Sequence, residues 1–287
     1  MMMKKLFLSL LVAGVLASCQ KESSQGPDSN QPLSAKTELN TAYGTDAMQK
    51  MDLYLPAGRT DTTRVIVMVH GGAWVEGDKA EFTPYVSVLQ QRFPGYAVAN
   101  INYRLASVSG NYFPTQENDM KAAIKFLAEN AASFHISQKM VLLGASAGGH
   151  MALLQAYKNS TPKIMAVVDF FGPTSMTQLY NDASNFQTAT GIQILMQGTP
   201  ASNPTAYQQS SPVSFVNAQT PPTIMLHGTA DDVVKPSHST NLSTQLTAAG
   251  VVNQLVTYTG RGHELWPADV MTDAFNKIEA FVKANAK

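Results

Sequence analysis

Short apolar runs alternate with stretches of helical pattern from about residue 37 onward. Residues 65–69 form a continuous apolar run, which is typical of a strand that is covered on both faces. Similar runs follow at 96–101, 140–143, 164–170, 223–226 and 255–258. Helical stretches lie between and after them, at roughly 80–92, 116–132, 147–158, 237–249 and 267–284. This alternation predicts an α/β fold with a mostly parallel sheet and helices on both faces.

Two segments depart from this alternation. Near the start, residues 37–43 and 49–55 have the pattern of two short strands, which predicts an antiparallel hairpin that supplies edge strands. Later, a connection from about 174 to 220 is rich in Gln, Asn, Thr and Ser, and a loop of this length usually is a lid or a binding element. No second core is evident, so the pattern predicts one domain, 37–287, with a lid insertion at about 174–220.

Residues 1–18 have the pattern of a bacterial export signal. Lys4 and Lys5 are basic, and the apolar run that follows, 6–16, is too short to cross a hydrocarbon core of about 30 Å as a helix. The run leads into the sequence L-A-S-C, which resembles a lipobox, the motif whose cysteine is lipidated and becomes the first mature residue. Cys19, the cysteine of this motif, is the only cysteine of the chain. We therefore expect residues 1–18 to be removed and Cys19 to carry a lipid anchor; the alternative is an ordinary secretory signal followed by an unrelated cysteine.

The segment after this motif, 19–36, is polar and almost free of large apolar side chains, which predicts a disordered tether. By resemblance to lipoproteins, Gln20 after the cysteine, in place of Asp, favours the outer membrane. The expected location is therefore the periplasmic face of that membrane or the cell surface.

Composition excludes several classes of function. The chain has 20 Lys and Arg against 20 Asp and Glu, so no charge excess points to a nucleic acid partner. A single cysteine excludes a disulfide framework and Cys-rich metal sites. The sequence has no zinc-protease, phosphate-loop or dinucleotide motif, so we expect neither a metal nor a cofactor. The oligomeric state stays open.

The sharpest chemical signal is the sequence G-A-S-A-G at 144–148, which follows a predicted strand and precedes a predicted helix. This is the G-x-S-x-G pattern in the strand–turn–helix context of a nucleophile elbow. The glycines allow a tight turn that lifts the Ser146 hydroxyl above the sheet. The turn also places it at a helix N-terminus, whose partial positive charge favours a developing oxyanion. Ser146 is therefore the candidate nucleophile.

A second signal is the sequence H-G-G-A-W at 70–74, which follows the strand predicted at 65–69. Together with the elbow, this loop resembles that of the α/β-hydrolase esterases, in particular the hormone-sensitive-lipase-like and the carbohydrate-esterase or feruloyl-esterase-like branches. The short N-terminal part leaves no room for a helical cap, which favours the second branch. The resemblance implies that the backbone N–H groups of Gly72, Ala73 and Ala147 form an oxyanion hole. Trp74 and Trp266 flank the two catalytic loops, and they either line the acyl or sugar site or only pack.

A serine hydroxyl needs a base and an orienting carboxylate to become a nucleophile. Chain order in this fold is nucleophile, acid, histidine, which leaves three late histidines: His227, His238 and His263. His227 matches a structural histidine in the family pattern H-G-x-x-D, and His238 begins a predicted helix, so His263 is the candidate base. The same pattern favours Asp231 over its neighbour Asp232 as the acid. The other histidines, which we expect to be structural, are His70, His135 and His150.

These residues predict a lipid-anchored serine esterase that acts on short acyl esters, such as acetyl or feruloyl groups on polysaccharides, through an acyl-enzyme at Ser146. One alternative keeps the same catalytic residues but cleaves amides or peptides, as prolyl-oligopeptidase-like hydrolases do; the chain lacks room for their propeller. A second alternative is a non-catalytic glycan-binding lipoprotein on a decayed hydrolase fold. The intact set of Ser146, Asp231 and His263 argues against decay. The expected partners are the ester or acylated glycan substrate and a membrane.

Overall fold

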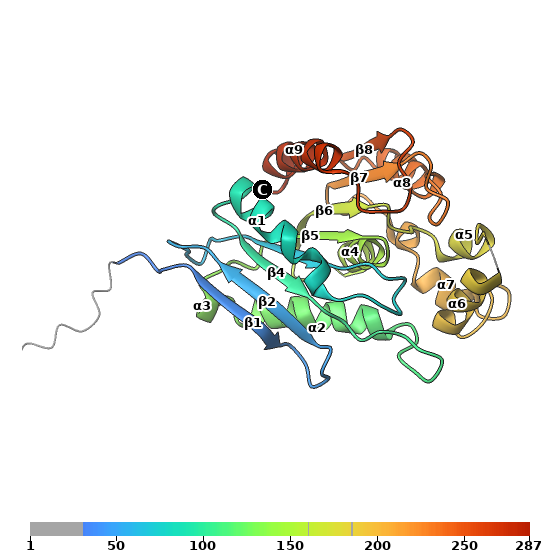
Figure 1. Cartoon of the computed structure of the whole chain (residues 1–287), viewed down its shortest axis with the longest axis horizontal. Coiled ribbons are helices and arrows are strands. Elements are labelled where there is room, and N and C mark those ends of the chain that lie inside the picture. The colour runs from blue at the N-terminus through green and yellow to red at the C-terminus, as the bar shows by residue number, and fades with distance from the viewer. Residues whose placement is uncertain (1–30, 160, 185) are drawn as a thin grey trace, which may run out of the picture. The chain divides into compact units, whose positions relative to one another are not determined.

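A mixed sheet runs through the part of the chain that the computed structural model describes, residues 31–159, 161–184 and 186–287 (Figure 1). Its eight strands lie in the order β1-β2-β4-β3-β5-β6-β7-β8. They are β1 (Lys36–Ala42), β2 (Lys50–Leu55), β3 (Val65–Val69), β4 (Ala97–Ile101), β5 (Met140–Ala145), β6 (Ile164–Phe170), β7 (Thr223–Gly228) and β8 (Asn253–Tyr258). The predicted signal peptide, Cys19 and most of the predicted tether lie outside the described residues.

The strand directions confirm the predicted architecture. Strands β3 to β8 are parallel to one another, whereas β1 pairs with β2, and β2 with β4, in antiparallel fashion. The hairpin of β1 and β2 therefore supplies the antiparallel edge, and the parallel strands inside the sheet, from β3 to β7, are buried along their whole length. The first parallel strand, β3, is buried along its whole length.

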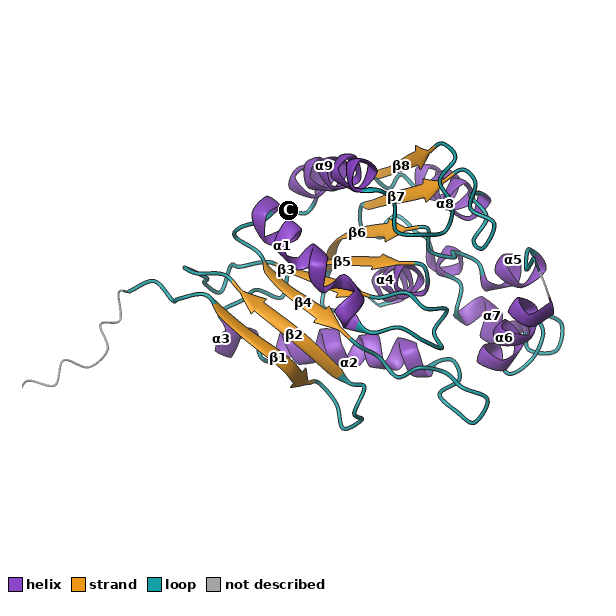
Figure 2. Cartoon of the chain, viewed as in Figure 1, coloured by secondary structure: helices purple, strands orange, loops and turns teal. Residues whose placement is uncertain are grey.

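Helices cover both faces of the sheet (Figure 2). They are η1 (Lys79–Phe82), α1 (Thr83–Arg92), α2 (Thr115–Glu129), α3 (Ala131–Phe134), α4 (Ala147–Lys158), α5 (Met176–Asn181), α6 (Phe186–Met196), α7 (Pro204–Gln209), η2 (Pro212–Phe215), α8 (Ser237–Ala248) and α9 (Ala268–Asn285). Because side chains alternate along a strand, β3 sends Val67 to the core beneath α2, α4 and α8 and Met68 to the core beneath α1 and α9. The helical spacing predicted for α2 is confirmed, since Ile124 and Leu127 are buried there.

The long connection between β6 and β7 is helical rather than irregular. It contains α5, α6, α7 and η2, and we call residues 174–220 the insertion. Met176 and Ile192 pack into the core beneath α4, and the insertion lies beyond the carboxyl ends of β5 and β6 (Figure 1). Parallel strands place their functional loops at this edge of the sheet, so the insertion is in position to shape a site there.

Candidate active site

Ser146 occupies a strained turn between β5 and α4. Its φ of 54° and ψ of −122° lie outside the conformations that a side-chain-bearing residue normally adopts. The flanking glycines make the turn possible, because a Cβ at Gly144 would collide with the backbone of Gly148, and one at Gly148 would collide with the carbonyl of Val69. The turn places Ser146 at the N-terminus of α4, where the first backbone N–H groups have no partner within the helix.

A hydrogen-bonded chain links Ser146 to residues far away in the sequence. The Ser146 hydroxyl donates to His263 Nε2 at 2.8 Å, and His263 Nδ1 donates to Asp231 Oδ2 at 2.7 Å. The second oxygen of Asp231 accepts from the backbone N–H groups of Val233 and Val234, at 3.0 and 2.9 Å. The neighbouring Asp232 is exposed. Of the two adjacent carboxylates, Asp231 is therefore the one that orients the histidine.

The surroundings of Asp231 keep its carboxylate charged. Burial alone would raise the pKa of Asp231, but hydrogen bonds from His227, His263 and the N–H of Val234 outweigh it and hold the pKa well below its usual range. His227 is itself fully buried and hydrogen-bonded, with Nδ1 at 2.7 Å from Ser239 Oγ. An ionised Asp231 stabilises a positive charge on His263, which is what a base that accepts a proton from serine requires.

The loop after β3 is held by hydrogen bonds to two of its backbone carbonyl groups. The Gly71 carbonyl accepts from His70 Nδ1 at 2.8 Å and from the Tyr103 hydroxyl at 3.0 Å. The Gly72 carbonyl accepts from the N–H groups of residues 75 and 76, at 2.9 and 3.0 Å. Because C=O and N–H point in opposite directions across a trans peptide, these bonds turn the N–H groups of Gly72 and Ala73 away from the loop's interior. Both residues line cavities that also contain Ser146.

Two cavities meet at Ser146. The insertion-side cavity, of about 380 Å³, is bordered by Trp74 and by apolar residues of the insertion; it is lined by Ala73, Trp74, Val75, Ser146, Pro173, Leu179, Thr188, Gly191, Ile192, Leu195, Val233 and Val234. The histidine-side cavity, of about 350 Å³, contains His263 and three carboxylates; it is lined by Gly71, Gly72, Ala73, Glu76, Glu81, Phe82, Ala145, Ser146, Phe171, Val233, His263, Glu264 and Leu265. The site thus has an apolar side and an acidic side.

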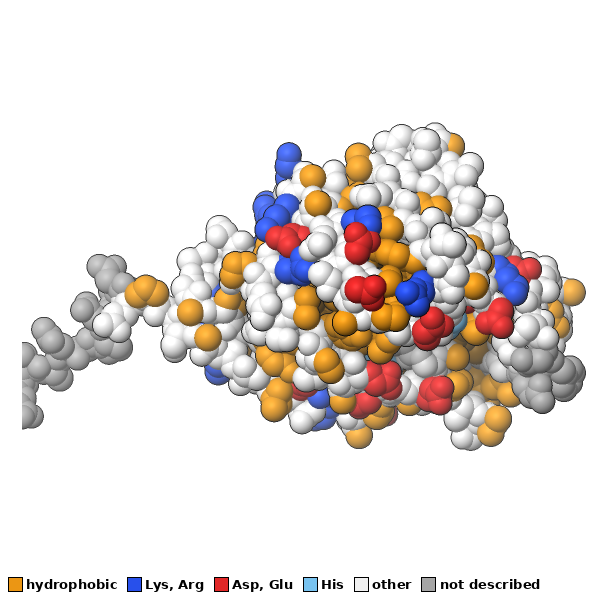
Figure 3. All heavy atoms as spheres, turned by 45° about the horizontal axis from the view of Figure 1, so that its top comes forward, with side chains coloured by type: hydrophobic (Ala, Val, Ile, Leu, Met, Phe, Trp, Pro, Cys, Tyr) orange, Lys and Arg blue, Asp and Glu red, His pale blue; other side chains and the backbone are white. Residues whose placement is uncertain are grey.

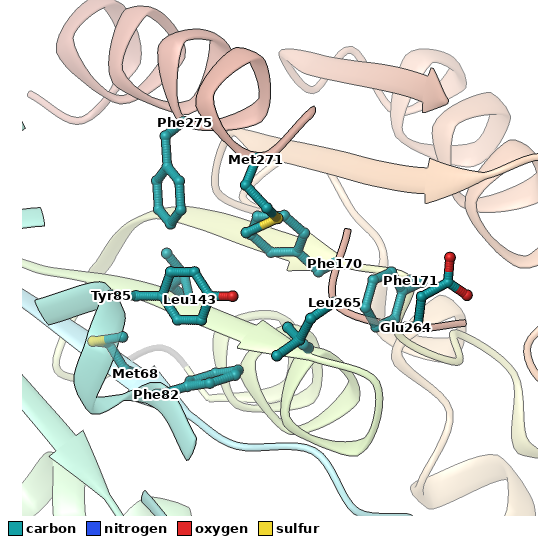
Figure 4. Close-up of a pocket in the computed structure, with 11 residues that line it drawn as sticks. Met68, Phe82, Tyr85, Leu143, Phe170, Phe171, Glu264, Leu265, Met271 and Phe275 are labelled. Atoms are coloured by element: carbon teal, nitrogen blue, oxygen red, sulfur yellow. The ribbon is translucent and has the colours of Figure 1, made fainter. Parts of the chain in front are cut away.

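An apolar slot between the sheet, α1 and α9 shares Phe82, Phe171 and Leu265 with the lining of the histidine-side cavity. Figure 4 shows Tyr85, Phe82, Phe170 and Phe275 around this slot, with Leu265 reaching it from the loop that carries His263. Acidic side chains are interspersed with apolar ones on the face of the molecule that carries α9 (Figure 3). A substrate that approaches His263 therefore meets both carboxylates and apolar surface.

The BD-FAE family model matches residues 51–246, a stretch that includes Gly72, Ser146 and Asp231 and ends before His263. The chain belongs to the BD-FAE family. Esterase LipC of Mycobacterium tuberculosis is 26% identical over 206 residues, which make up 67% of this chain and 50% of LipC. The chain spans about half the length of the curated relatives it matches.

Solved structures resemble this BD-FAE member over most of its length. A truncated form of a carbohydrate esterase from gut microbiota has a TM-score of 0.72 and 26% identity, over 85% of this chain and 96% of that one. A bifunctional GH43-CE protein of Bacteroides eggerthii has a TM-score of 0.74 and 28% identity, over 85% of this chain and 38% of that one. The sheet order and these similarities confirm the predicted α/β-hydrolase fold.

The two tryptophans singled out in the sequence differ in position. Trp74 lines the insertion-side cavity, although it is only 5% exposed. Trp266 is buried among Phe170, Phe171 and Tyr258, lines none of the cavities described above, and donates from its indole to the Gly262 carbonyl at 3.2 Å. Its contacts therefore brace the loop that carries His263.

His263 is the one described histidine that has a hydrogen bond to the Ser146 hydroxyl. His238 is buried and accepts the N–H of Thr174 at Nδ1, His70 stacks on Tyr103, and His135 ends α3. Sequence reasoning gave His150 no partner, but the structure hydrogen-bonds it to both Trp74 and the insertion. The one signal in the sequence was Trp74 in the loop motif, because a buried indole N–H usually has a hydrogen-bond acceptor.

The described residues hold no cluster of His, Cys, Asp or Glu that would bind a metal ion. Among the same residues, no helix combines the length and the apolar character needed to cross a membrane.

Proposed function

We propose that this chain is a serine esterase that hydrolyses acyl esters through an acyl-enzyme at Ser146. The observation that carries the proposal is the hydrogen-bonded chain from Ser146 through His263 to Asp231, with distances of 2.8 and 2.7 Å. A nucleophile, a base and an orienting carboxylate within hydrogen-bond reach of one another are what acyl transfer requires. Relatives and structural neighbours that are named esterases support it.

In the acylation step, the Ser146 oxygen attacks the ester carbonyl while His263 Nε2 takes its proton. Asp231, which the structure keeps charged, stabilises the resulting imidazolium. The carbonyl oxygen becomes an oxyanion and accepts hydrogen bonds from the N–H groups of Gly72, Ala73 and Ala147. Each such donor contributes on the order of 3 kcal/mol to the stability of the transition state.

From the position of His263, we assign the two cavities to the two halves of the ester. The leaving alcohol must take its proton from His263 Nε2, so it occupies the histidine-side cavity, which His263 lines. The acyl group then extends into the insertion-side cavity. After the alcohol leaves, water enters on the histidine side and its oxygen attacks the acyl carbonyl while His263 takes one of its protons. His263 then gives that proton to the Ser146 oxygen as the acid is released.

The lining of each cavity supports an acylated sugar as the substrate. Glu76, Glu81 and Glu264 are exposed around the alcohol position, where carboxylates accept hydrogen bonds from sugar hydroxyls. The insertion-side cavity, of about 380 Å³, is far larger than an acetyl group, which needs about 60 Å³, twice the volume of a water molecule in the liquid. Of the acetyl and feruloyl groups that the sequence suggests, the larger aromatic one fills this cavity better.

The test compares wild type with Ser146→Ala on p-nitrophenyl acetate and on acetylated and feruloylated xylan. We expect wild-type turnover, with a higher kcat/KM on feruloyl than on acetyl esters. Ser146→Ala should lose activity about 10⁴- to 10⁶-fold with an unchanged melting temperature. Activity in Ser146→Ala within tenfold of wild type would refute the proposed nucleophile, and equal kcat/KM on acetyl and feruloyl esters would refute the preference.

A further inference from the structure

The loop that carries the proposed oxyanion donors holds two residues in the left-handed region. Ala73 has a φ of 49° and Trp74 a φ of 63°, although neither is glycine. A side-chain-bearing residue stays in this region only where its surroundings hold it there. Ala73 is exposed, so its conformation depends on the anchoring of its neighbour as well as on the hydrogen bonds of the Gly72 carbonyl. Trp74, which is buried, is that anchor.

His150 holds Trp74 from the helix that follows the nucleophile. The Trp74 indole N–H donates to His150 Nδ1 at 3.2 Å, and the two rings meet edge to face with centroids 5.1 Å apart. His150 Nε2 donates to the Ser210 carbonyl at 2.6 Å. An indole nitrogen only donates and a carbonyl oxygen only accepts, so these partners fix one tautomer of the imidazole. Burial lowers the pKa of His150 to about 4, which keeps the ring neutral near pH 7.

The second partner, Ser210, belongs to the insertion. It follows α7, and its hydroxyl donates to the Tyr207 carbonyl. The same insertion supplies Leu179 and Ile192 to the cavity assigned to the acyl group. One neutral imidazole therefore connects the wall of the acyl cavity, through Ser210, to the loop that contains Ala73.

We propose that His150 is a positioning residue, which ties the insertion to the oxyanion loop and so holds the N–H of Ala73 toward the reacting carbonyl. The inference rests on the acyl-enzyme mechanism proposed above. A donor that is misplaced by an ångström stabilises the transition state less but changes substrate binding little. Breaking the connection should therefore lower kcat and kcat/KM together and leave KM almost unchanged.

Substitutions with different hydrogen-bonding atoms separate the two halves of the connection. In His150→Gln, the amide NH₂ replaces Nε2 and still reaches Ser210, but the acceptor for Trp74 is lost. In His150→Asn, the amide oxygen replaces Nδ1 and still accepts from Trp74. Trp74→Phe removes the indole N–H and keeps an aromatic ring. Tyr157→Phe is the control, because it removes a different buried hydrogen bond, to Thr223 Oγ1, from the same helix.

The experiment measures kcat, KM and melting temperature on p-nitrophenyl acetate for these variants and for the double variant of Trp74→Phe with His150→Gln. We expect kcat to fall about tenfold in His150→Gln and Trp74→Phe with KM within twofold of wild type. The double variant should be no slower than the slower single one, because both remove the same bond. His150→Asn, which keeps the Trp74 bond but loses the Ser210 bond, should lose less kcat than His150→Gln, and Tyr157→Phe should keep wild-type kcat.

The inference is wrong if His150→Gln and Trp74→Phe keep wild-type kcat, if their losses multiply in the double variant, or if Tyr157→Phe loses as much activity at the same melting temperature. Trp74→Phe decides the question if His150→Gln does not fold. Ser146→Ala is assayed alongside. Activity in that variant overturns the proposed mechanism, whereas an inactive Ser146→Ala beside a fully active His150→Gln overturns only the role of His150.

Discussion

Two neighbouring carboxylates show how environment, rather than residue type, selects a role. Asp231 is buried, accepts two backbone N–H groups and bonds to His263, whereas Asp232 is exposed. The fixed geometry of Asp231 lets it hold one tautomer of the histidine. An exposed carboxylate next to it is screened by water and contributes little.

Asp231→Asn should reduce kcat about 10³- to 10⁴-fold. An amide NH₂ facing His263 Nδ1 would favour the wrong tautomer and leave the imidazolium without its counter-charge. Asp232→Asn is the control and should stay within twofold of wild type. Steady-state hydrolysis of p-nitrophenyl acetate measures both, and similar losses in the two variants would contradict the assignment of Asp231.

Protonation of His150 should make stability depend on pH. Burial lowers its pKa to about 4 in the folded chain, whereas an unfolded chain titrates histidine near 6.5. Between these values only the unfolded state binds the proton, so the free energy of unfolding falls as the pH drops from about 6.5 to about 4. This difference in pKa corresponds to about 3 kcal/mol.

In the matched variant His150→Gln, the side chain does not titrate in this pH range. Urea unfolding of wild type and His150→Gln between pH 4.5 and 7.5 should therefore show a stability advantage of wild type that shrinks toward low pH. An advantage that stays constant over this range would mean that His150 does not stay neutral in the folded state.

At the scale of single residues, the sequence predicted the catalytic side chains better than the side chains that hold them in place. Ser146 lies in a local motif, and chain order singles out His263 among the late histidines. The bond from Trp74 to His150 joins residues 76 positions apart, and the bond from His150 to Ser210 spans 60. Neither pair lies in a local pattern, so only the packed fold brings these side chains together.

At the scale of elements, the insertion is the part that sequence reasoning described least well. Its helices are short, with 6 residues in α5, 11 in α6 and 6 in α7, so their apolar residues do not repeat often enough to show a helical period. The regular strands and longer helices were predicted close to their observed bounds. These elements are buried against their neighbours over several helical turns or several strand residues, so their apolar patterns repeat often enough to be recognised in the sequence.

Filling the insertion-side cavity from α6 should change acyl preference. Gly191 lines this cavity, and a Cβ there would meet no atom within 4 Å, so Gly191→Phe should fold and occupy acyl space. We expect the ratio of kcat/KM for p-nitrophenyl butyrate over acetate to fall about tenfold, a typical effect of blocking part of an apolar pocket. Gly95→Phe is the control, since Gly95 also has open space and lines none of the cavities described above. An unchanged ratio in Gly191→Phe would place the acyl group elsewhere.

At the scale of the whole molecule, we propose that the hydrolase domain is held at a membrane by a lipid on Cys19. The proposal rests on the sequence alone, since Cys19 lies outside the described residues. Cys19→Ser removes the residue that would carry the lipid, so the protein should be released from membranes on mild washing. Stable anchoring requires more than one acyl chain, which the variant would lack. Membrane fractionation with immunodetection checks this, and a Cys19→Ser protein that stays with the membranes like wild type would contradict it.

The overall architecture was the most predictable feature, because alternating strands and helices leave few ways to arrange a parallel sheet. That architecture brings the ends of β3 and β5 and the loops after β7 and β8 to one edge of the sheet, where Gly72, Ser146, Asp231 and His263 meet. The central claim is that an acyl group passes through one atom at this edge, the Ser146 oxygen.

Peptide mass spectrometry of enzyme quenched with acid during turnover of p-nitrophenyl acetate tests this claim most directly. We expect an acetyl group on the peptide that contains Ser146, together with an initial burst of p-nitrophenol that equals the amount of enzyme. The adduct should be absent from Ser146→Ala. A burst with acetyl on another residue, or full turnover with no acyl adduct, would show that Ser146 is not the nucleophile.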